Sequence, residues 1–412
     1  MATPMPKPKA DRGPLAGYRV IDITTVLLGP YAAQWLGDLG ADVIKVEAPP
    51  AGDSTRHVGP NRHKGMSGTF LNANRNKRSI ALDLKQEPAR AAQRALIGGA
   101  DVLLHNMRAQ AIARLGFAYA DVARIKPDIV YCGAFGYSQK GPYAARPAYD
   151  DLIQAHAGLA AMAARIDGVP RFVPSVMADK LVGLTTAMSI LAALLHRERT
   201  GEGQQIEVPM FETLTAFLSL EHLYGAGFVP PLSKTGYGRL TTPYRRPYKC
   251  KDGYIAIIPY TDRHWRALFA IAGREDLSAD PRFTDYAART AHIDALYRIL
   301  DGIAADKTIA EWMEACGAAE IPCAPVTDLE DLLTDPHIQA VGLFQRHTHP
   351  TEGETLLTGT PVSFSASPAS IRAPAPRFGE HGAELLREAG MDETAIAALR
   401  ATGALLEPDP EP

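Results

Sequence analysis

Residues 18–47 read YRVIDITTVLLGPYAAQWLGDLGADVIKVE and contain two β-branched runs on either side of a helical pattern. The run Tyr18–Thr24 predicts one strand, and Asp42–Glu47 predicts a second. Between them, Gly29 and Pro30 open a helical segment that ends in a glycine. A strand, a helix and a strand in this order form a β-α-β unit, in which the two strands run parallel. This segment therefore predicts an α/β protein organised on a parallel sheet.

The same alternation of strands and helices continues along the chain. Further strands are predicted at Ser79–Leu84, Asp101–His105, Asp128–Ala134 and Gln205–Pro209, with helical segments between them. Alternation of this kind is typical of a parallel sheet that is covered on both faces. Ligands of such sheets bind beyond the carboxyl ends of the strands. We therefore expect Thr25, Asn106 and Phe135 to gather at one site.

The composition is typical of a large globular protein with two domains: 412 residues, of which 46% are hydrophobic and 22% are charged. A formal net charge of -3 gives no indication of a nucleic-acid partner. Four cysteines without CxxC or zinc spacing favour a reducing, cytoplasmic location. The N-terminal residues MATPMPKPKADRGPLAG contain no apolar core, and the longest apolar run is short for a bilayer, so we expect neither export nor membrane anchoring.

Asp179 stands near the start of a second informative segment, residues 172–204, which read FVPSVMADKLVGLTTAMSILAALLHRERTGEGQ. The run Leu181–Leu195 contains no charge, so we expect a helix that is buried nearly all round. An acid at the start of such a helix is stabilised in its ionised form by free N–H groups and the helix dipole. Asp179 can therefore serve as a helix cap or as a nucleophile, and this segment alone leaves both roles open.

The amino-acid composition changes near Tyr224, where Pro and Gly become frequent, and this change indicates a domain boundary. A hairpin and helices then predict a small α+β domain, and the tail, with a strand-like Thr360–Ser365, is expected to rejoin the large domain. We predict the divisions 1–223, 224–328 and 329–412. The hairpin is expected at Tyr248–Cys250 and Tyr254–Ile258, and helices at Arg263–Ala272, Ala291–Ala304, Ile309–Cys316, Leu329–Leu333 and Ala383–Ala389.

Several segments, taken together and in order, resemble the family III CoA-transferases, the CaiB/BaiF group of formyl-CoA transferase and carnitine CoA-transferase. They are PLAGYRVIDIT, LGADVIKVE, NRNKRSIALDLK, ADVLLHNMRAQAIARLG, VMADKLVG, LLHRERTGEGQ, IPCAPV and RAPAPRFGEHGAELLREAG, and they span nearly the whole chain. The resemblance implies a large Rossmann-like domain with a parallel sheet, built from both chain ends, and a smaller α+β domain. It also implies an interlocked homodimer.

The resemblance implies roles for individual residues. The family's nucleophile falls on Asp179, and the acid of its mobile loop falls on Asp150, which follows Tyr149. Leu27 replaces a glutamine of formyl-CoA transferase and Ala48 replaces an arginine, so adenine binding is expected to differ. The implied CoA contacts, in which basic side chains suit phosphate groups, are Thr25, Val26, Leu27, Leu28, Leu82, Lys85, Asn106, Met107, Arg108, Arg114 and Tyr149.

The activity that the resemblance implies is transfer of CoA from an acyl-CoA donor to a carboxylic acid, through an aspartyl intermediate and without a metal or redox cofactor. One alternative is an α-methylacyl-CoA racemase of the same fold, but Tyr149 stands where its titrating histidine would fall. Another is a non-catalytic CoA-binding protein. The glycine-rich loop of formyl-CoA transferase has no good counterpart, which predicts an acceptor other than formate or oxalate. Arg245 and Arg246 either pair with a second carboxylate of the acceptor or are exposed linker charges.

Overall fold

The structure is a computed structural model that describes residues 13–408. The expected lack of an export signal rests mainly on residues 1–12, which lie outside the described residues. Contacts divide the chain into two units. Among the described residues, unit 1 contains residues 13–157, 174–217 and 337–408, whereas unit 2 contains residues 158–173 and 218–336. The division of the chain into residues 1–223, 224–328 and 329–412 stays a prediction.

Unit 1 is built on a seven-stranded sheet with the order β12-β3-β2-β1-β4-β5-β6. All neighbouring strands pair in parallel except β12, which pairs antiparallel with β3. The order 3-2-1-4-5-6 is that of a doubly wound Rossmann-like fold, so the predicted α/β class is confirmed. The strands are β1 (Arg19–Ile23), β2 (Asp42–Glu47), β3 (Lys77–Leu82), β4 (Val102–His105), β5 (Val130–Phe135), β6 (Gln204–Pro209) and β12 (Leu405–Leu406).

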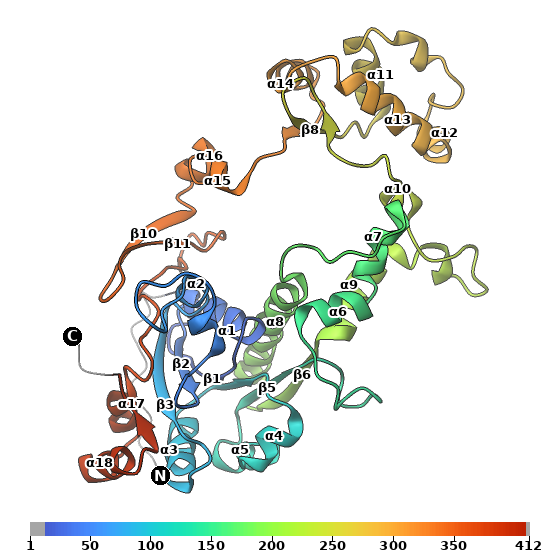
Figure 1. Ribbon diagram of the computed structural model, residues 1–412. Helices are drawn as coiled ribbons and strands as arrows, with labels where there is room; N and C mark the ends of the chain where they lie inside the picture. Colours follow the sequence, from blue (N-terminus) through green and yellow to red (C-terminus); the bar gives the residue numbers. More distant parts are fainter. Residues whose placement is uncertain (1–12, 409–412) are drawn as a thin grey trace. The chain divides into compact units, whose positions relative to one another are not determined.

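Helices cover both faces of this sheet (Figure 1). On one face, a core of Ile, Leu, Val and Ala side chains joins the strands to α3 (Glu87–Gly98), α5 (Tyr119–Ile125), α17 (Gly382–Glu388) and α18 (Glu393–Ala401). On the other face, α1 (Leu28–Asp38) packs against β1 and β2 and crosses α8. Because α17, α18 and β12 come from the end of the chain, the tail does rejoin the large unit.

Helix α8 (Met177–Thr200) is the long apolar helix expected from the sequence, and Asp179 lies in its first turn. The expectation that it is buried nearly all round is wrong, because Leu184, Met188 and Leu195 are exposed along one side. Within residues 13–408, α8 is the one helix long and apolar enough to cross a membrane by length and composition, a test that buried core helices also pass. Half of its most apolar window is buried in the fold, against elements that include α1 and β5.

Unit 2 contains a three-stranded antiparallel sheet of β7 (Tyr248–Lys249), β8 (Tyr254–Ile257) and β9 (Cys323–Pro325). The predicted hairpin at residues 248–258 is therefore confirmed. An apolar core that includes Trp265 and Trp312 joins this sheet to α11 (Asp262–Ile271), α13 (Ile293–Ala304) and α14 (Ile309–Ala318), which lie within two residues of the predicted helices.

The predicted strand at Thr360–Ser365 is wrong, because no strand forms there. The preceding residues instead form an antiparallel hairpin of β10 (Phe344–His349) and β11 (Gly353–Thr358). The remaining helices are η1 (Ser54–His57), α2 (Gly68–Ala73), α4 (Ala109–Arg114), α6 (Asp150–His156), α7 (Leu159–Asp167), α9 (Met210–His222), η2 (Tyr224–Gly227), α10 (Gly238–Thr241), η3 (Glu275–Ser278), α12 (Tyr286–Ala291), α15 (Leu329–Leu332) and α16 (Pro336–Ala340).

Candidate active site

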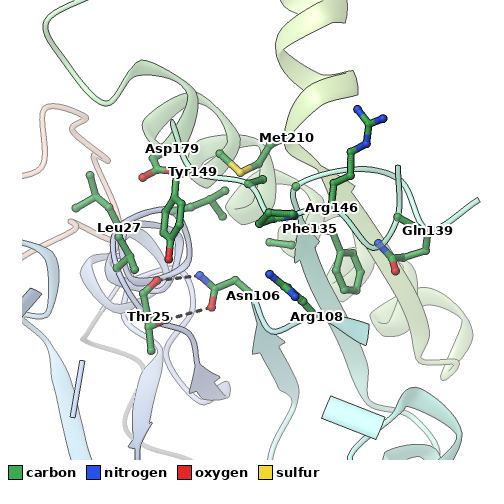
Figure 2. A pocket seen from close by; sticks show the side chains of 17 residues that line it. Thr25, Leu27, Asn106, Arg108, Phe135, Gln139, Arg146, Tyr149, Asp179 and Met210 are labelled. Carbon is green, nitrogen blue, oxygen red and sulfur yellow. Dashed lines mark hydrogen bonds between the residues drawn. The ribbon is translucent and has the colours of Figure 1, made fainter. Parts of the chain in front are cut away.

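A cavity of about 220 Å³ opens in unit 1 beyond the carboxyl ends of β1, β4, β5 and β6 (Figure 2). This is the edge at which the strand order reverses between β1 and β4, where ligands of doubly wound sheets bind. The gathering of residues expected there is confirmed. The cavity is lined by Thr25, Val26, Leu27, Leu28, Asn106, Arg108, Ala134, Phe135, Gly136, Gln139, Ala144, Arg146, Pro147, Ala148, Tyr149, Asp179 and Met210.

The turn between β1 and α1 forms one wall, and Asn106 fixes it from the end of β4. The Asn106 side-chain oxygen accepts a hydrogen bond from the Thr25 N–H at 3.1 Å, and its side-chain nitrogen donates to the Thr25 carbonyl at 2.8 Å (Figure 2). One side chain therefore satisfies both backbone groups of Thr25. Asn106 acts as a structural bridge between the two strand ends that frame the cavity.

The next residue of this turn, Val26, has φ of +71°, in the left-handed region that β-branched residues avoid. Its N–H donates to Asp53 Oδ1 at 3.1 Å, and the buried Lys45 ammonium donates to Asp53 Oδ2 at 2.9 Å. Lys45 also donates to the Thr24 carbonyl at 3.0 Å. This buried ion pair holds the turn in a strained shape, and strain of this kind is concentrated at functional sites.

Asp179 is positioned by the close crossing of α8 and α1. A Cβ atom at Gly183 would lie 2.8 Å from the Leu28 carbonyl oxygen and 3.1 Å from the Tyr31 ring. Glycine at this point therefore allows the two helices to approach closely, one turn of α8 beyond Asp179. As a result, Asp179 is only 8% exposed and still lines the cavity beside the turn at Thr25 to Leu28.

Burial, reinforced by the negative charges of Asp150 and Asp151, raises the pKa of Asp179 from 3.8 to about 7. The sequence led us to expect that the helix start would keep this carboxylate ionised. That expectation is wrong at neutral pH, because loss of solvent and two neighbouring acids outweigh the favourable helix dipole. Near pH 7, Asp179 is divided between its protonated and ionised forms.

Asp150 begins α6 and is bonded to the start of α8. Its Oδ1 accepts a hydrogen bond from the Asp179 backbone N–H at 2.8 Å, and its Oδ2 accepts one from the Gln154 side chain at 2.6 Å. Gln154 also donates to the Ser175 carbonyl at 3.1 Å. Asp150 therefore caps α8 from another helix, although it is not among the cavity-lining residues.

The predicted CoA contacts fall into two groups. Seven of them line the cavity together with Asp179: Thr25, Val26, Leu27, Leu28, Asn106, Arg108 and Tyr149. The other four do not line it. Leu82 is fully buried in β3 and Met107 packs against the core, whereas Lys85 and Arg114 are exposed.

Sequence reasoning missed Gln139, Arg146 and Met210, which also line the cavity (Figure 2). Met210 directly follows β6, so the rule that sites form at strand ends could have found it. Gln139 and Arg146 lie in the long segment between β5 and α6, for which no local pattern predicts a position. Within residues 13–408, no group of three or more His, Cys, Asp or Glu side chains is placed to hold a metal ion.

A family model described as CoA-transferase family III matches residues 15–382. This chain is a family III CoA-transferase. The match covers most of both units and every residue that lines the cavity.

Relatives of this CoA-transferase include enzymes that are named for dicarboxylic acids. The succinate–glutarate CoA-transferase of Agrobacterium fabrum is 34% identical over 94% of this chain and 97% of the relative. The acetyl-CoA:oxalate CoA-transferase of Acetobacter aceti is 34% identical over 92% of this chain and 97% of the relative. A solved structure of a CAIB/BAIF family protein from Brucella suis matches with a TM-score of 0.78 at 30% identity, over 92% of this chain and 100% of that chain.

The CoA-transferase therefore moves CoA between an acyl-CoA thioester and a carboxylic acid. These findings support this activity over the racemase and over a non-catalytic CoA-binding protein, the two alternatives that the sequence left open.

Proposed function

We propose that Asp179 is the nucleophile of this CoA-transferase and that its carboxylate carries first an acyl group and then CoA. The observation that supports this most directly is the chemistry of the cavity wall. Among the described residues that line the cavity, Asp179 is the one carboxylate, and this set includes no Cys, Ser, Lys or His. A buried carboxylate with a raised pKa is a better nucleophile than a solvated one, while part of it remains ionised near neutral pH.

The proposed reaction begins when an Asp179 oxygen attacks the thioester carbonyl of the donor. The C–S bond breaks, leaving an acyl-aspartyl anhydride and a CoA thiolate. The thiolate then attacks the aspartyl carbonyl, which releases the donor acid as a carboxylate and leaves an aspartyl-CoA thioester. The acceptor carboxylate repeats these two steps in reverse, so that the acceptor leaves as its CoA thioester and the Asp179 carboxylate is regenerated.

We propose that CoA binds along the residues predicted from the family resemblance. Arg108 reaches the cavity and suits a phosphate group, and the backbone of the strained turn at Thr25 to Leu28 suits the thioester end. Lys85 and Arg114 are exposed outside the cavity, where they suit the outer phosphate-bearing end of a long substrate. The side chain of Tyr149 is 66% exposed at the rim, which suits a segment that covers the bound substrate.

Asp150 is proposed to act through Asp179. Both of its oxygens accept hydrogen bonds, and its charge contributes to the raised pKa of Asp179. It thereby holds the start of α8 in place and keeps the nucleophile poised between its two protonation states. A direct contact with the acyl group would require one of these hydrogen bonds to open.

We propose a dicarboxylic acid as the acceptor, because the named relatives act on succinate, glutarate and oxalate. The relative named for oxalate gives no support to the sequence-based exclusion of oxalate, so we keep oxalate among the candidate acceptors. We also propose that the enzyme is a cytoplasmic, interlocked homodimer, as the family resemblance implies.

Covalent trapping tests the role of Asp179. The enzyme is incubated with succinyl-CoA, treated with hydroxylamine and digested for mass spectrometry. We expect a hydroxamate at Asp179, and we expect Asp179→Asn to lose both the label and activity by orders of magnitude. Asp121→Asn, which alters an acid on α5 away from the cavity, is the control and should be labelled and active. A label on another residue, or a fully active Asp179→Asn enzyme, would exclude this mechanism.

A further inference from the structure

Unit 2 contains a second cavity, of about 170 Å³, that the proposed reaction does not use. Its lining includes residues of α10, the β7–β8 hairpin and α13, all within unit 2. Three arginines and two tyrosines line it together with five apolar residues. The lining residues are Arg239, Arg245, Arg246, Pro247, Tyr248, Ala256, Ile257, Ile258, Pro259 and Tyr297.

Of the three guanidinium groups of this arginine cavity, one pairs with a carboxylate in the described residues. Arg246 pairs with Asp301 at 3.0 Å. Arg239 instead donates from Nε to the Tyr297 hydroxyl at 3.0 Å, which orients the guanidinium but does not neutralise it. In the part of the chain that the structure describes, no carboxylate forms a salt bridge with Arg239 or Arg245. Like charges held together in this way repel one another, and an anion between them would relieve the repulsion.

The tyrosines provide further hydrogen-bonding groups and no negative charge. Burial raises the pKa of Tyr248, with further contributions from Tyr297 and Asp301, so its phenol stays protonated at neutral pH. Tyr248 is 3% exposed and Tyr297 is 5% exposed. The arginine side chains can only donate hydrogen bonds, and each phenol has one O–H to donate, which suits the oxygens of an anion.

The floor of the cavity is apolar. Ile257 is buried, and Pro247, Ala256, Ile258 and Pro259 complete the surface. Arg239 is partly buried, whereas Arg245 and Arg246 are exposed to solvent. The floor also offers contact to a short carbon chain, which inorganic ions lack.

We propose that the arginine cavity is a binding site for a small organic acid. Its carboxylate or phosphate oxygens would contact Arg239, Arg245 and Arg246, and its carbon chain would lie on the apolar floor. The fork of a guanidinium matches both kinds of oxygen group in a bidentate arrangement. This binding requires no covalent step and no CoA, so it stands or falls independently of the role of Asp179.

Protection of arginines from phenylglyoxal locates the site directly. The full-length protein is modified at constant ionic strength, alone or with glutarate, n-butyl phosphate or glutaramide, and the extent of reaction at each arginine is read by peptide mass spectrometry. Glutarate and n-butyl phosphate separate a carboxylate ligand from a phosphate ligand. Glutaramide has the shape of glutarate without its charge. Arg266, an exposed arginine on α11 outside the cavity, is the internal control.

We expect at least one of the two acids to slow modification of Arg239 and Arg245 about fivefold or more, with no protection of Arg266 and none by glutaramide. The acid that protects better identifies the oxygen group. Binding measured by calorimetry should weaken about tenfold in Arg245→Gln, equivalent to about 1.4 kcal/mol, and should not change in Arg266→Gln. Equal protection by glutaramide, or no protection by either acid, would overturn the proposal. Protection of Arg108 alone would place the acid in the Asp179 cavity and would overturn it as well.

Discussion

Asp179 illustrates how much of a residue's chemistry depends on its neighbours. In the unfolded chain this carboxyl group is an ordinary acid with a pKa of 3.8. In the folded protein its pKa is raised to about 7. The shift has two physical sources, loss of solvent and the charges of Asp150 and Asp151. A raised pKa means that ionising Asp179 costs the folded state free energy. The site therefore opposes folding stability at neutral pH, as is common for groups that catalysis requires.

This cost predicts how stability depends on pH. Below pH 4, Asp179 is protonated in both states and costs nothing. Between about pH 4 and pH 7, the unfolded chain releases the proton and the folded protein keeps it, so the free energy of unfolding falls as the pH rises. Asp179→Asn removes this dependence. We expect the stability advantage of this variant over the unsubstituted protein to be about 3 kcal/mol larger at pH 8 than at pH 5.

Urea unfolding of both proteins at the two pH values measures this difference. Asp121→Asn should show no such gain between pH 5 and pH 8. An Asp179→Asn protein whose advantage is the same at both pH values would mean that Asp179 titrates normally.

Among the elements, the pair α1 and α8 decides where Asp179, the proposed nucleophile, lies. The two helices cross at Gly183, where a side chain would meet the Leu28 carbonyl. Because Leu28 begins α1 and lines the cavity, any separation of the helices moves one wall of the cavity away from Asp179. The crossing therefore couples helix packing to the geometry of the site.

Gly183→Ala tests this coupling. The added methyl group must push α8 away from α1, so we expect a loss of about 1 to 3 kcal/mol in the free energy of unfolding and a clear fall in kcat. Gly98→Ala is the matched control, because Gly98 ends α3 and a Cβ atom there has open space. That substitution should leave kcat unchanged. Equal stability and activity for Gly183→Ala would show that the crossing is not tight.

At the scale of the whole molecule, one side of α8 carries exposed apolar residues. Leu184, Met188 and Leu195 are 41%, 63% and 53% exposed, although they belong to the one helix within residues 13–408 that is long and apolar enough to cross a membrane. A row of this kind is typical of a surface that another protein covers. The row supports the proposed homodimer, in which a second copy would bury it.

Light scattering of the Met188→Glu variant tests this prediction. We expect the unsubstituted protein to have the mass of a dimer at micromolar concentration, and the new charge to weaken association because it would be buried in the interface. Met313→Glu places the same charge on α14 of unit 2 and should leave the dimer intact. A monomeric unsubstituted protein that is fully active would contradict the proposal.

The sequence by itself determined the fold class and most of the elements of the sheet. Runs such as Asp42–Glu47 predicted strands correctly because Val43, Ile44 and Val46 are β-branched and suit the buried surface of a sheet. The charged Lys45 and Glu47 of this run are buried in ion pairs. The sequence did not predict the hairpin β10–β11, because its strands, FQRHTH and GETLLT, are partly polar and form a sheet of only two strands. Thr360–Ser365 has strand-like residues but pairs with no neighbour, and pairing is what makes a strand.

The sequence also identified Asp179 and most of the cavity-lining residues. The ends of strands and the motifs that carry the family resemblance can both be read from short segments of the chain. Only the tertiary structure decided the environment of Asp179. Its burial, the cap supplied by Asp150 and the support of the Val26 turn by Asp53 all join residues that are distant in sequence. The same is true of the arginine cavity, in which Arg239 meets Tyr297. A pKa or a binding site depends on which groups share a small volume, and that volume exists only once the chain has folded.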